Sequence, residues 1–307
     1  MVRTYRTAAD FRQALDAHLR SLAQSTHADL ARLRQRYVFE RLLARLAAYF
    51  GDRVVLKGGL ALELRLGRAR ATRDVDLRVS GNPGLLASEL ARAGAVFGLD
   101  GDFLTFEIDL YPKFPTIDGE GMLYQGQRFR VMAMMGGKIY GSAFGVDVAM
   151  GDRMSYRPEL LVGARDFEFA GIPPIQVLAY AREVHLAEKL HAFTMPRPRP
   201  NSRVKDLPDM TLLGLTGPFE SSAIMSAIKD TFIHRATHPI PAEIPAPPMS
   251  WDVPYGRMAQ EDRLPWATLT EVAEAARAFL NPVLCGNDGI WAPASWSWQE
   301  SRCSHPP

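Results

Sequence analysis

The stretch from Val54 to Leu77 constrains the fold more than any other part of the chain. A short apolar run is followed by Lys57 and the pair Gly58-Gly59, then by a helical segment and a second apolar run that carries Asp74 and Asp76. Successive strand side chains alternate between faces, so the two aspartates share one face of the second strand. A glycine pair after a strand lets the backbone approach phosphate, because no Cβ blocks it and the next helix begins there. The stretch therefore predicts a strand, helix and strand unit with an anion site beside paired carboxylates.

Each part of this unit also has a simpler interpretation. Two adjacent glycines are most often only a turn, and an aspartate pair on an edge strand facing water is often structural. Like charges side by side repel unless a cation or solvent offsets them, so two carboxylates on one face, with Thr72 beside them, favour a divalent metal. The whole order of strand, KGG, helix and apolar-Asp-apolar-Asp-apolar strand is far more specific than either part.

Length and composition restrict the class of protein. A chain of 307 residues is long enough for one large domain or two. It contains no apolar run of about 18 residues and no signal-peptide pattern at its start, so we expect a cytoplasmic protein without a membrane segment. Cys285 and Cys303 are too few for a disulfide scaffold and are not spaced as a metal site.

The charge is distributed unevenly. Up to Arg73 the chain has 15 Lys and Arg against 6 Asp and Glu, which leaves 21 against 28 in the remainder. A basic first part beside an acidic remainder indicates a polyanion-binding surface near a metal centre. The alternative, favoured by charge alone, is a solvated helix face rich in arginine.

Periodicity predicts helices before and after a group of strands, an α/β (α+β) arrangement. We expect residues 1–165 to hold N-terminal helices and the α/β core, and residues 166–307 to be mainly helical. The expected helices are Ala8–Phe50, with a break and cap at Ser25-Thr26, and also Leu85–Ala95, Ile175–Phe193 and Leu269–Leu284. The other expected strands are Phe103–Tyr111, Gln127–Met134 and Phe144–Ala149. The proline-rich segment Pro239–Pro254 is expected to be a strap along the surface.

Later segments supply further candidate residues. Asp147 lies between two valines of a predicted strand, so it is either a partner of the aspartate pair or a salt-bridged sheet residue. Lys189 lies on a predicted helix, where a lysine is usually only solvated. Asp206 and Asp209 are spaced i, i+3, which places both on one helix face.

Five motifs in a fixed order carry a family resemblance. They are LKGGLAL, RATRDVDL, GVDVAMGD, AEKLHAF and NSRVKDLPDM. In these motifs the chain resembles the AbiEii/AbiGii-type (MenT-like) nucleotidyltransferase toxins of the DNA polymerase β-like nucleotidyltransferase superfamily, and the resemblance runs nearly end to end. It implies the mixed sheet of that superfamily with flanking helices.

The resemblance also implies a role for each candidate residue. The triphosphate of the nucleotide would be bound by Gly58, Gly59 and Lys57, with Thr72 close by, and Lys189 would also contact it. The metal would be held by Asp74, Asp76 and Asp147. The catalytic site would be completed by Asp206 or Asp209. Pro208 departs from the family pattern, in which an aromatic or aliphatic residue is more usual.

The implied activity is transfer of a nucleoside monophosphate from an NTP to the 3′ end of tRNA, by a toxin that a cognate antitoxin neutralises. Three aspartates without a His or Cys cluster favour Mg²⁺ or Mn²⁺ over Zn²⁺ as the cofactor. Two alternatives remain at this stage. In the first, the enzyme transfers the nucleotide to a protein or a small molecule in place of tRNA. In the second, this chain is a non-catalytic regulator that binds RNA.

Overall fold

Two long helices, α1 (Ala8–Thr26) and α2 (Leu30–Phe50), begin the fold. The computed structural model describes residues 4–67, 72–110, 116–117, 126–150, 156–197 and 203–300. The predicted break between two helices is confirmed and follows directly after Thr26. The predicted cap at Ser25-Thr26 is wrong, because α1 continues through both residues and ends where His27 adopts a left-handed conformation. Asp29 caps α2 instead, since its side chain accepts a hydrogen bond from a first-turn backbone N–H at 2.8 Å.

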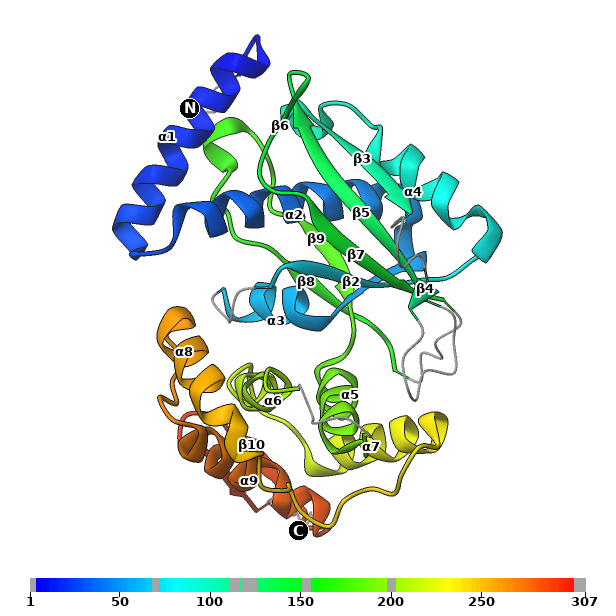
Figure 1. Cartoon of the computed structure of the whole chain (residues 1–307), viewed down its shortest axis with the longest axis vertical. Helices are drawn as coiled ribbons and strands as arrows, with labels where there is room; N and C mark the ends of the chain where they lie inside the picture. Colours follow the sequence, from blue (N-terminus) through cyan, green and yellow to red (C-terminus); the bar gives the residue numbers. More distant parts are fainter. Residues whose placement is uncertain are drawn as a thin grey trace, which may run out of the picture.

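Nine strands of the described residues form one mixed sheet. Their bounds are β1 (Val54–Lys57), β2 (Asp74–Val79), β3 (Leu104–Leu110), β4 (Thr116–Ile117), β5 (Gly126–Met135), β6 (Lys138–Ile139), β7 (Phe144–Ala149), β8 (Glu159–Val162) and β9 (Gln176–Ala179). The order is β3-β5-β7-β2-β1-β9-β8, with β4 and β6 paired to β5 (Figure 1). Strand β2 runs antiparallel to β1 and parallel to β7, so the strand with the aspartate pair is central.

Strand β9 corrects the prediction that Ile175–Phe193 is one helix. Only the part from Arg182 onward is helical, and the residues before it pair parallel with β1 and antiparallel with β8. Val177 and Ala179 are buried on alternate positions. A short apolar run next to a helix does not reveal its pairing partners, which lie far away in sequence. The sheet thus includes a strand beyond residue 165, and the division at that point stays a prediction.

The remaining helices are α3 (Gly58–Leu66), α4 (Leu86–Gly94), α5 (Arg182–Thr194), α6 (Asp206–Gly214), α7 (Ser221–Arg235), α8 (Asp252–Asp262) and α9 (Leu269–Leu284), and a hairpin of β10 (Ile290–Ala292) and β11 (Ser297–Gln299) follows. Of these helices, α4 lies beside β3, α3 lies between the sheet and the helices below it, and α5 to α9 form the lower half of the view in Figure 1. None of those in the described ranges is long and apolar enough to cross a membrane.

Two buried hydrophobic clusters hold these elements together. One joins α1, α2 and α4 to the sheet, and the other lies among α5 to α9. Helix α3 belongs to both, since Leu60 and Ala61 pack in the first cluster and Leu62 packs in the second. The helix that follows the glycine pair therefore lies between the two cores, which fixes its N-terminus relative to both.

The predicted proline-rich strap is confirmed only in part. Residues 239–248 have no regular structure between α7 and α8 (yellow in Figure 1). Pro254, which we expected in the strap, is the third residue of α8. Proline is tolerated in the first turn of a helix, because the N–H that it lacks has no intrahelical partner there.

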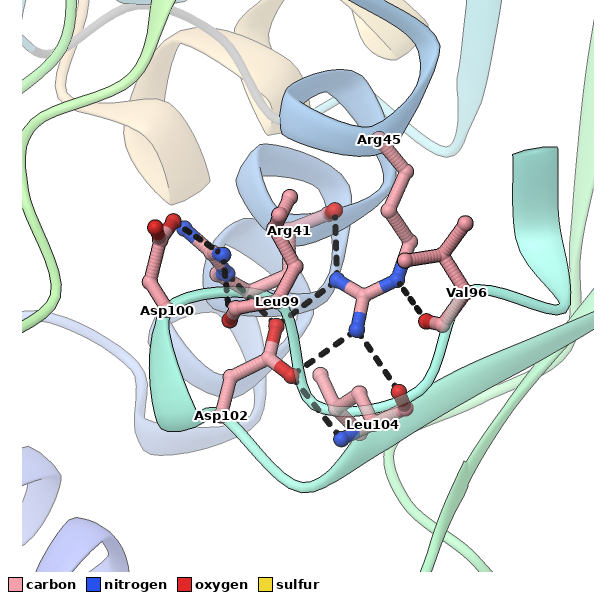
Figure 2. A network of polar contacts seen from close by, with 7 residues as sticks. All are labelled: Arg41, Arg45, Val96, Leu99, Asp100, Asp102 and Leu104. Carbon is pink, nitrogen blue, oxygen red and sulfur yellow. Dashed lines mark hydrogen bonds and ion pairs between the residues drawn. The ribbon is translucent and has the colours of Figure 1, made fainter. Parts of the chain in front are cut away.

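Two arginines of α2 meet one buried aspartate at the start of β3 (Figure 2). Asp102 is fully buried and accepts hydrogen bonds from Arg41 at 2.7 Å and from Arg45 at 2.7 and 2.8 Å. Arg45 also donates to the carbonyl oxygens of Val96 and Leu104. This network holds the connection between α4 and β3 against α2, on the same sheet that carries the aspartate pair.

Candidate active site

Four charged side chains form a row across four neighbouring strands. Asp76 of β2 lies opposite Lys57 of β1 on one side and opposite Asp147 of β7 on the other. Asp147 in turn lies opposite Arg128 of β5, which donates to both of its carboxylate oxygens at 2.7 and 2.6 Å. Asp147 was expected to be either a partner of the aspartate pair or a salt-bridged sheet residue. In the structure it is a neighbour of the pair and is also salt-bridged.

The environment of Asp76 disfavours its charged form. Burial raises the pKa of Asp76, and the neighbouring carboxylates of Asp147 and Asp74 raise it further, whereas Lys57 and Lys189 lower it. Clustered carboxylates with a raised pKa gain from any added positive charge. The adjacent carboxylates of Asp74 and Asp76 therefore attract a cation.

Each carboxylate of the pair lies against a glycine. A Cβ on Gly58, whose φ is +67°, would lie 2.0 Å from an oxygen of Asp76. A Cβ on Gly145, which faces Asp74 across the parallel ladder, would lie 2.7 Å from an oxygen of that residue. Gly145 was not predicted from the sequence, although a glycine inside a strand is itself a signal of close approach.

Replacing Gly58 with alanine should therefore displace Asp76, and a second glycine provides a matched control. Gly67 has a φ of +64°, and a Cβ added there would meet no atom of the described residues within 4 Å beyond its chain neighbours. Gly67→Ala should cost only the left-handed strain of about 1 kcal/mol in the free energy of unfolding. Gly58→Ala should cost the same strain and also lower the transfer activity implied by the resemblance about a hundredfold. Thermal unfolding and transfer rates of both variants measure this; equal activities would show that Asp76 does not depend on Gly58.

The glycine pair forms the first turn of α3, as predicted. Lys57 occupies the N-cap position in an extended conformation, and its side chain makes no capping hydrogen bond. The Lys57 ammonium lies 3.6 Å from Glu188 and 5.1 Å from the centre of the Tyr180 ring. The helix N-terminus, with Gly59 at its second position, therefore presents N–H groups that favour an anion.

Helices α5 and α6 place a lysine between two aspartates. The Lys189 ammonium lies 2.9 Å from Asp206 and 2.9 Å from Asp209. Asp209 is fully buried, and Asp206 is nearly so. Pro208 is the third residue of α6, a first-turn position that tolerates proline, so the two aspartates still converge on one cation. Arg203 lies 4.0 Å from Asp206 on the outer side.

A pocket of about 450 Å³ brings most of the predicted residues together. It is lined by Gly59, Thr72, Arg73, Asp74, Asp76, Lys189, Arg197, Arg203, Lys205 and Asp206. Thr72 lies two residues before β2 and donates a hydrogen bond to the carbonyl oxygen of Asp74 at 3.1 Å, so the expectation that it shares the strand face is wrong. The other predicted residues neighbour residues that line the pocket. Lys57, Gly58 and Asp147 lie next to Asp76, and Asp209 pairs with Lys189.

Several functional side chains of the site were not identified from the sequence. Arg128 pairs with Asp147, and the cations Arg73, Arg197, Arg203 and Lys205 line the pocket. His185 on α5 is buried, and burial lowers its pKa well below the usual value, with Lys189 and Arg65 acting in the same direction. Arg73, Arg203 and Lys205 lie within motifs that carry the family resemblance, although no role was predicted for them. The positions of Arg128, Arg197 and His185 depend on how distant segments pack.

The donor atoms available to a metal are carboxylate oxygens. Asp74 and Asp76 present them at the pocket, and Asp147 lies on the next strand. Hard divalent ions such as Mg²⁺ prefer such oxygens. Among the described residues, no three His, Cys, Asp or Glu side chains are already arranged to hold a metal. The donor chemistry therefore fits Mg²⁺ or Mn²⁺, and Asp147 would have to turn to complete the set.

Comparisons with known proteins also indicate a nucleotidyltransferase. The structure is similar to that of the MenT4 nucleotidyltransferase toxin of Mycobacterium tuberculosis, with a TM-score of 0.54 and 15% identity over 98% of this chain and 96% of that one. Two Helicobacter pylori structures are more distant. JHP933 has a TM-score of 0.39 and 16% identity, over 66% of this chain and 74% of that one. A putative nucleotidyltransferase has a TM-score of 0.39 and 15% identity, over 81% of this chain and 92% of that one. No curated protein matches the sequence.

A family model gives the assignment directly. The model for the nucleotidyl transferase AbiEii toxin of type IV toxin–antitoxin systems matches residues 41–277, which is most of the chain. This range contains every candidate residue, from the glycine pair to Asp209. The likeness to MenT4 shows that the fold is the one expected for such an enzyme. The chain belongs to the AbiEii family of nucleotidyltransferase toxins.

Proposed function

We propose that the protein transfers a nucleoside monophosphate from an NTP to the 3′ end of tRNA, and thereby blocks translation. Membership of the family implies an NTP substrate and an antitoxin partner. The acceptor and the metal are the proposed parts. One observation carries the proposal: the carboxylates of Asp74 and Asp76, the N-terminus of α3 and Lys189 line the same pocket.

The pocket contains both the positive and the negative groups that this reaction requires. The N-terminus of α3 at Gly59 and the cations Lys189, Arg197 and Arg203 suit the triphosphate. In the reaction, the acceptor hydroxyl loses its proton and its oxygen bonds to the α-phosphorus, while the bond to the bridging β-phosphate oxygen breaks and pyrophosphate leaves. The pocket residues bind and orient the phosphates for this in-line displacement.

Asp74, Asp76 and Asp147 would hold the metal. When bound, Mg²⁺ or Mn²⁺ would neutralise the charge that develops on the phosphates and lower the pKa of the attacking hydroxyl. The glycines at 58 and 145 leave the space that the two pocket carboxylates occupy. Lys189 is held by Asp206 and Asp209, so its ammonium has a fixed position at the pocket wall.

Two adjoining pockets support a polymeric acceptor. A pocket of about 400 Å³ shares Thr72 and Arg73 with the active-site pocket. It shares four further residues, Arg32 and Arg36 among them, with a third pocket of about 750 Å³. A path thus leads from the carboxylates toward the N-terminus of α2, and both arginines and the acidic residues Asp29 and Glu63 line it. Such a path suits the phosphates of a chain of nucleotides better than a single small molecule.

The test is transfer from each of the four NTPs, labelled at the α-phosphate, to total tRNA with Mg²⁺ or with EDTA. We expect label in tRNA only with the metal. Periodate treatment of the tRNA, which destroys the 3′ cis-diol, should abolish labelling. NTP labelled at the γ-phosphate should leave no label, because pyrophosphate departs. The same assay with lysate protein in place of tRNA completes the design.

Each alternative acceptor gives a distinct result. Label that enters protein or a small molecule, and never RNA, would overturn the tRNA proposal and leave the transfer chemistry in place. Labelling that survives periodate would place the modification away from the 3′ end. RNA binding without any labelling, unaffected by EDTA, would identify a regulator in place of an enzyme.

A further inference from the structure

The salt bridge between Arg128 and Asp147 conflicts with the role of Asp147 as a metal ligand. The guanidinium contacts both carboxylate oxygens in a fork, at 2.7 and 2.6 Å. Such bidentate pairs fix the orientation of the carboxylate. Asp147 is nevertheless the cross-strand neighbour of Asp76. The arginine therefore occupies the carboxylate that a metal would need.

Arg128 also interacts electrostatically with all three aspartates. The hydrogen bond to Asp147 and the charges of Asp147, Asp74 and Asp76 raise the pKa of Arg128. Its side chain is 41% exposed, compared with 19% for the side chain of Asp147. A half-exposed arginine on the rim has other orientations available to it. Nucleotide phosphates offer it an equivalent bidentate partner.

We propose that Arg128 is a positioning residue that occupies Asp147 in the nucleotide-free protein and releases it when a nucleotide triphosphate binds. The proposal rests on the proposed function. Arg128 competes with the metal for Asp147 until the phosphates attract the guanidinium away. Nucleotide binding thereby completes the carboxylate set, so that metal binds tightly only together with substrate.

The test measures binding, without any transfer reaction. Mn²⁺ affinity is determined by electron paramagnetic resonance with no nucleotide present, and tripolyphosphate affinity is determined by calorimetry in EDTA. Arg128→Gln should bind Mn²⁺ about threefold to tenfold more tightly than the wild type, because the competing cation is gone. It should bind tripolyphosphate about threefold more weakly, because one phosphate partner is lost. A residue that only supported the fold would not shift the two affinities in opposite directions.

Arg130 provides the matched control. Arg130 is exposed and lies two residues after Arg128 on β5, so the two side chains are on the same face. The neighbour of Arg130 on β7 is Gly145, whereas the neighbour of Arg128 is Asp147. Arg130→Gln removes the same charge and should leave the Mn²⁺ affinity within about twofold of the wild type. Arg128→Lys keeps the charge without the fork and should give an intermediate Mn²⁺ affinity. Thermal unfolding of each variant checks the fold.

The outcomes separate this inference from the proposed function. If Arg128→Gln binds Mn²⁺ no more tightly than the wild type while the wild type labels tRNA, the proposed function stands and the role of Arg128 is wrong. If Arg128→Gln and Arg130→Gln tighten Mn²⁺ binding equally, the effect is one of overall charge and the inference also fails. If the wild type neither binds Mn²⁺ in the presence of NTP nor labels RNA, the proposed function itself fails.

Discussion

The Asp76→Asn variant should lose nucleotidyl transfer by at least about a thousandfold, because it removes several kcal/mol of charge stabilisation at the reacting phosphate. It should not melt below the wild type. Burial and the two neighbouring carboxylates raise the pKa of Asp76, so the charged form opposes folding at neutral pH, and a neutral amide of the same shape relieves that cost. Transfer assays with labelled NTP and a thermal unfolding curve measure both effects.

An exposed aspartate that does not line the active-site pocket controls for the loss of charge. Asp109 is exposed on β3, the strand at the edge of the sheet. Asp109→Asn should keep full activity and the wild-type melting temperature. If Asp76→Asn retained more than about a tenth of the wild-type rate, the central carboxylate would not take part in the chemistry and the metal assignment would fail.

Asp102→Asn should lower the free energy of unfolding by about 3–5 kcal/mol, the usual cost of leaving a buried charge without its partner. The substitution leaves the guanidinium groups of Arg41 and Arg45, which are 2% and 0% exposed, without the buried anion that joins them. Figure 2 shows that the remaining partners of Arg45 are carbonyl oxygens, which offer no full charge. Urea unfolding monitored by circular dichroism gives the difference directly.

Asp100 is the matched control, because it binds the same Arg41 at 2.8 Å but is 34% exposed. Asp100→Asn should cost less than about 1 kcal/mol, since water screens the pair. Equal losses for the two variants would show that burial does not set the strength of this network. Because the network holds α2 against the connection before β3, Asp102→Asn should leave the intrinsic transfer rate of the folded fraction unchanged.

Much of the site could be predicted because its signals are local. The alternation of Val75 and Leu77 with the aspartates fixes which face Asp74 and Asp76 share, since the period of a strand is two residues. The glycine pair after β1 predicts a helix start that suits phosphate. The order of motifs identified the family, which the match over residues 41–277 confirms.

The errors of prediction share one cause. Residues 176–179 are a strand only because they pair with β1, which lies more than a hundred positions earlier. Thr72 precedes the strand instead of continuing it, and Ser25-Thr26 stay within α1. In each case the local sequence allows more than one conformation, and the packing of distant segments selects one of them.

The sequence by itself determined the strand, helix and strand unit, the shared face of Asp74 and Asp76, and the family. Only the tertiary structure decided what surrounds them: Gly145 beside Asp74, the cations of the pocket, and Arg128 on Asp147. The physical reason is strand register. A shift of one residue in the pairing of β5 with β7 would turn Arg128 to the opposite face, and no local period of either strand encodes that register.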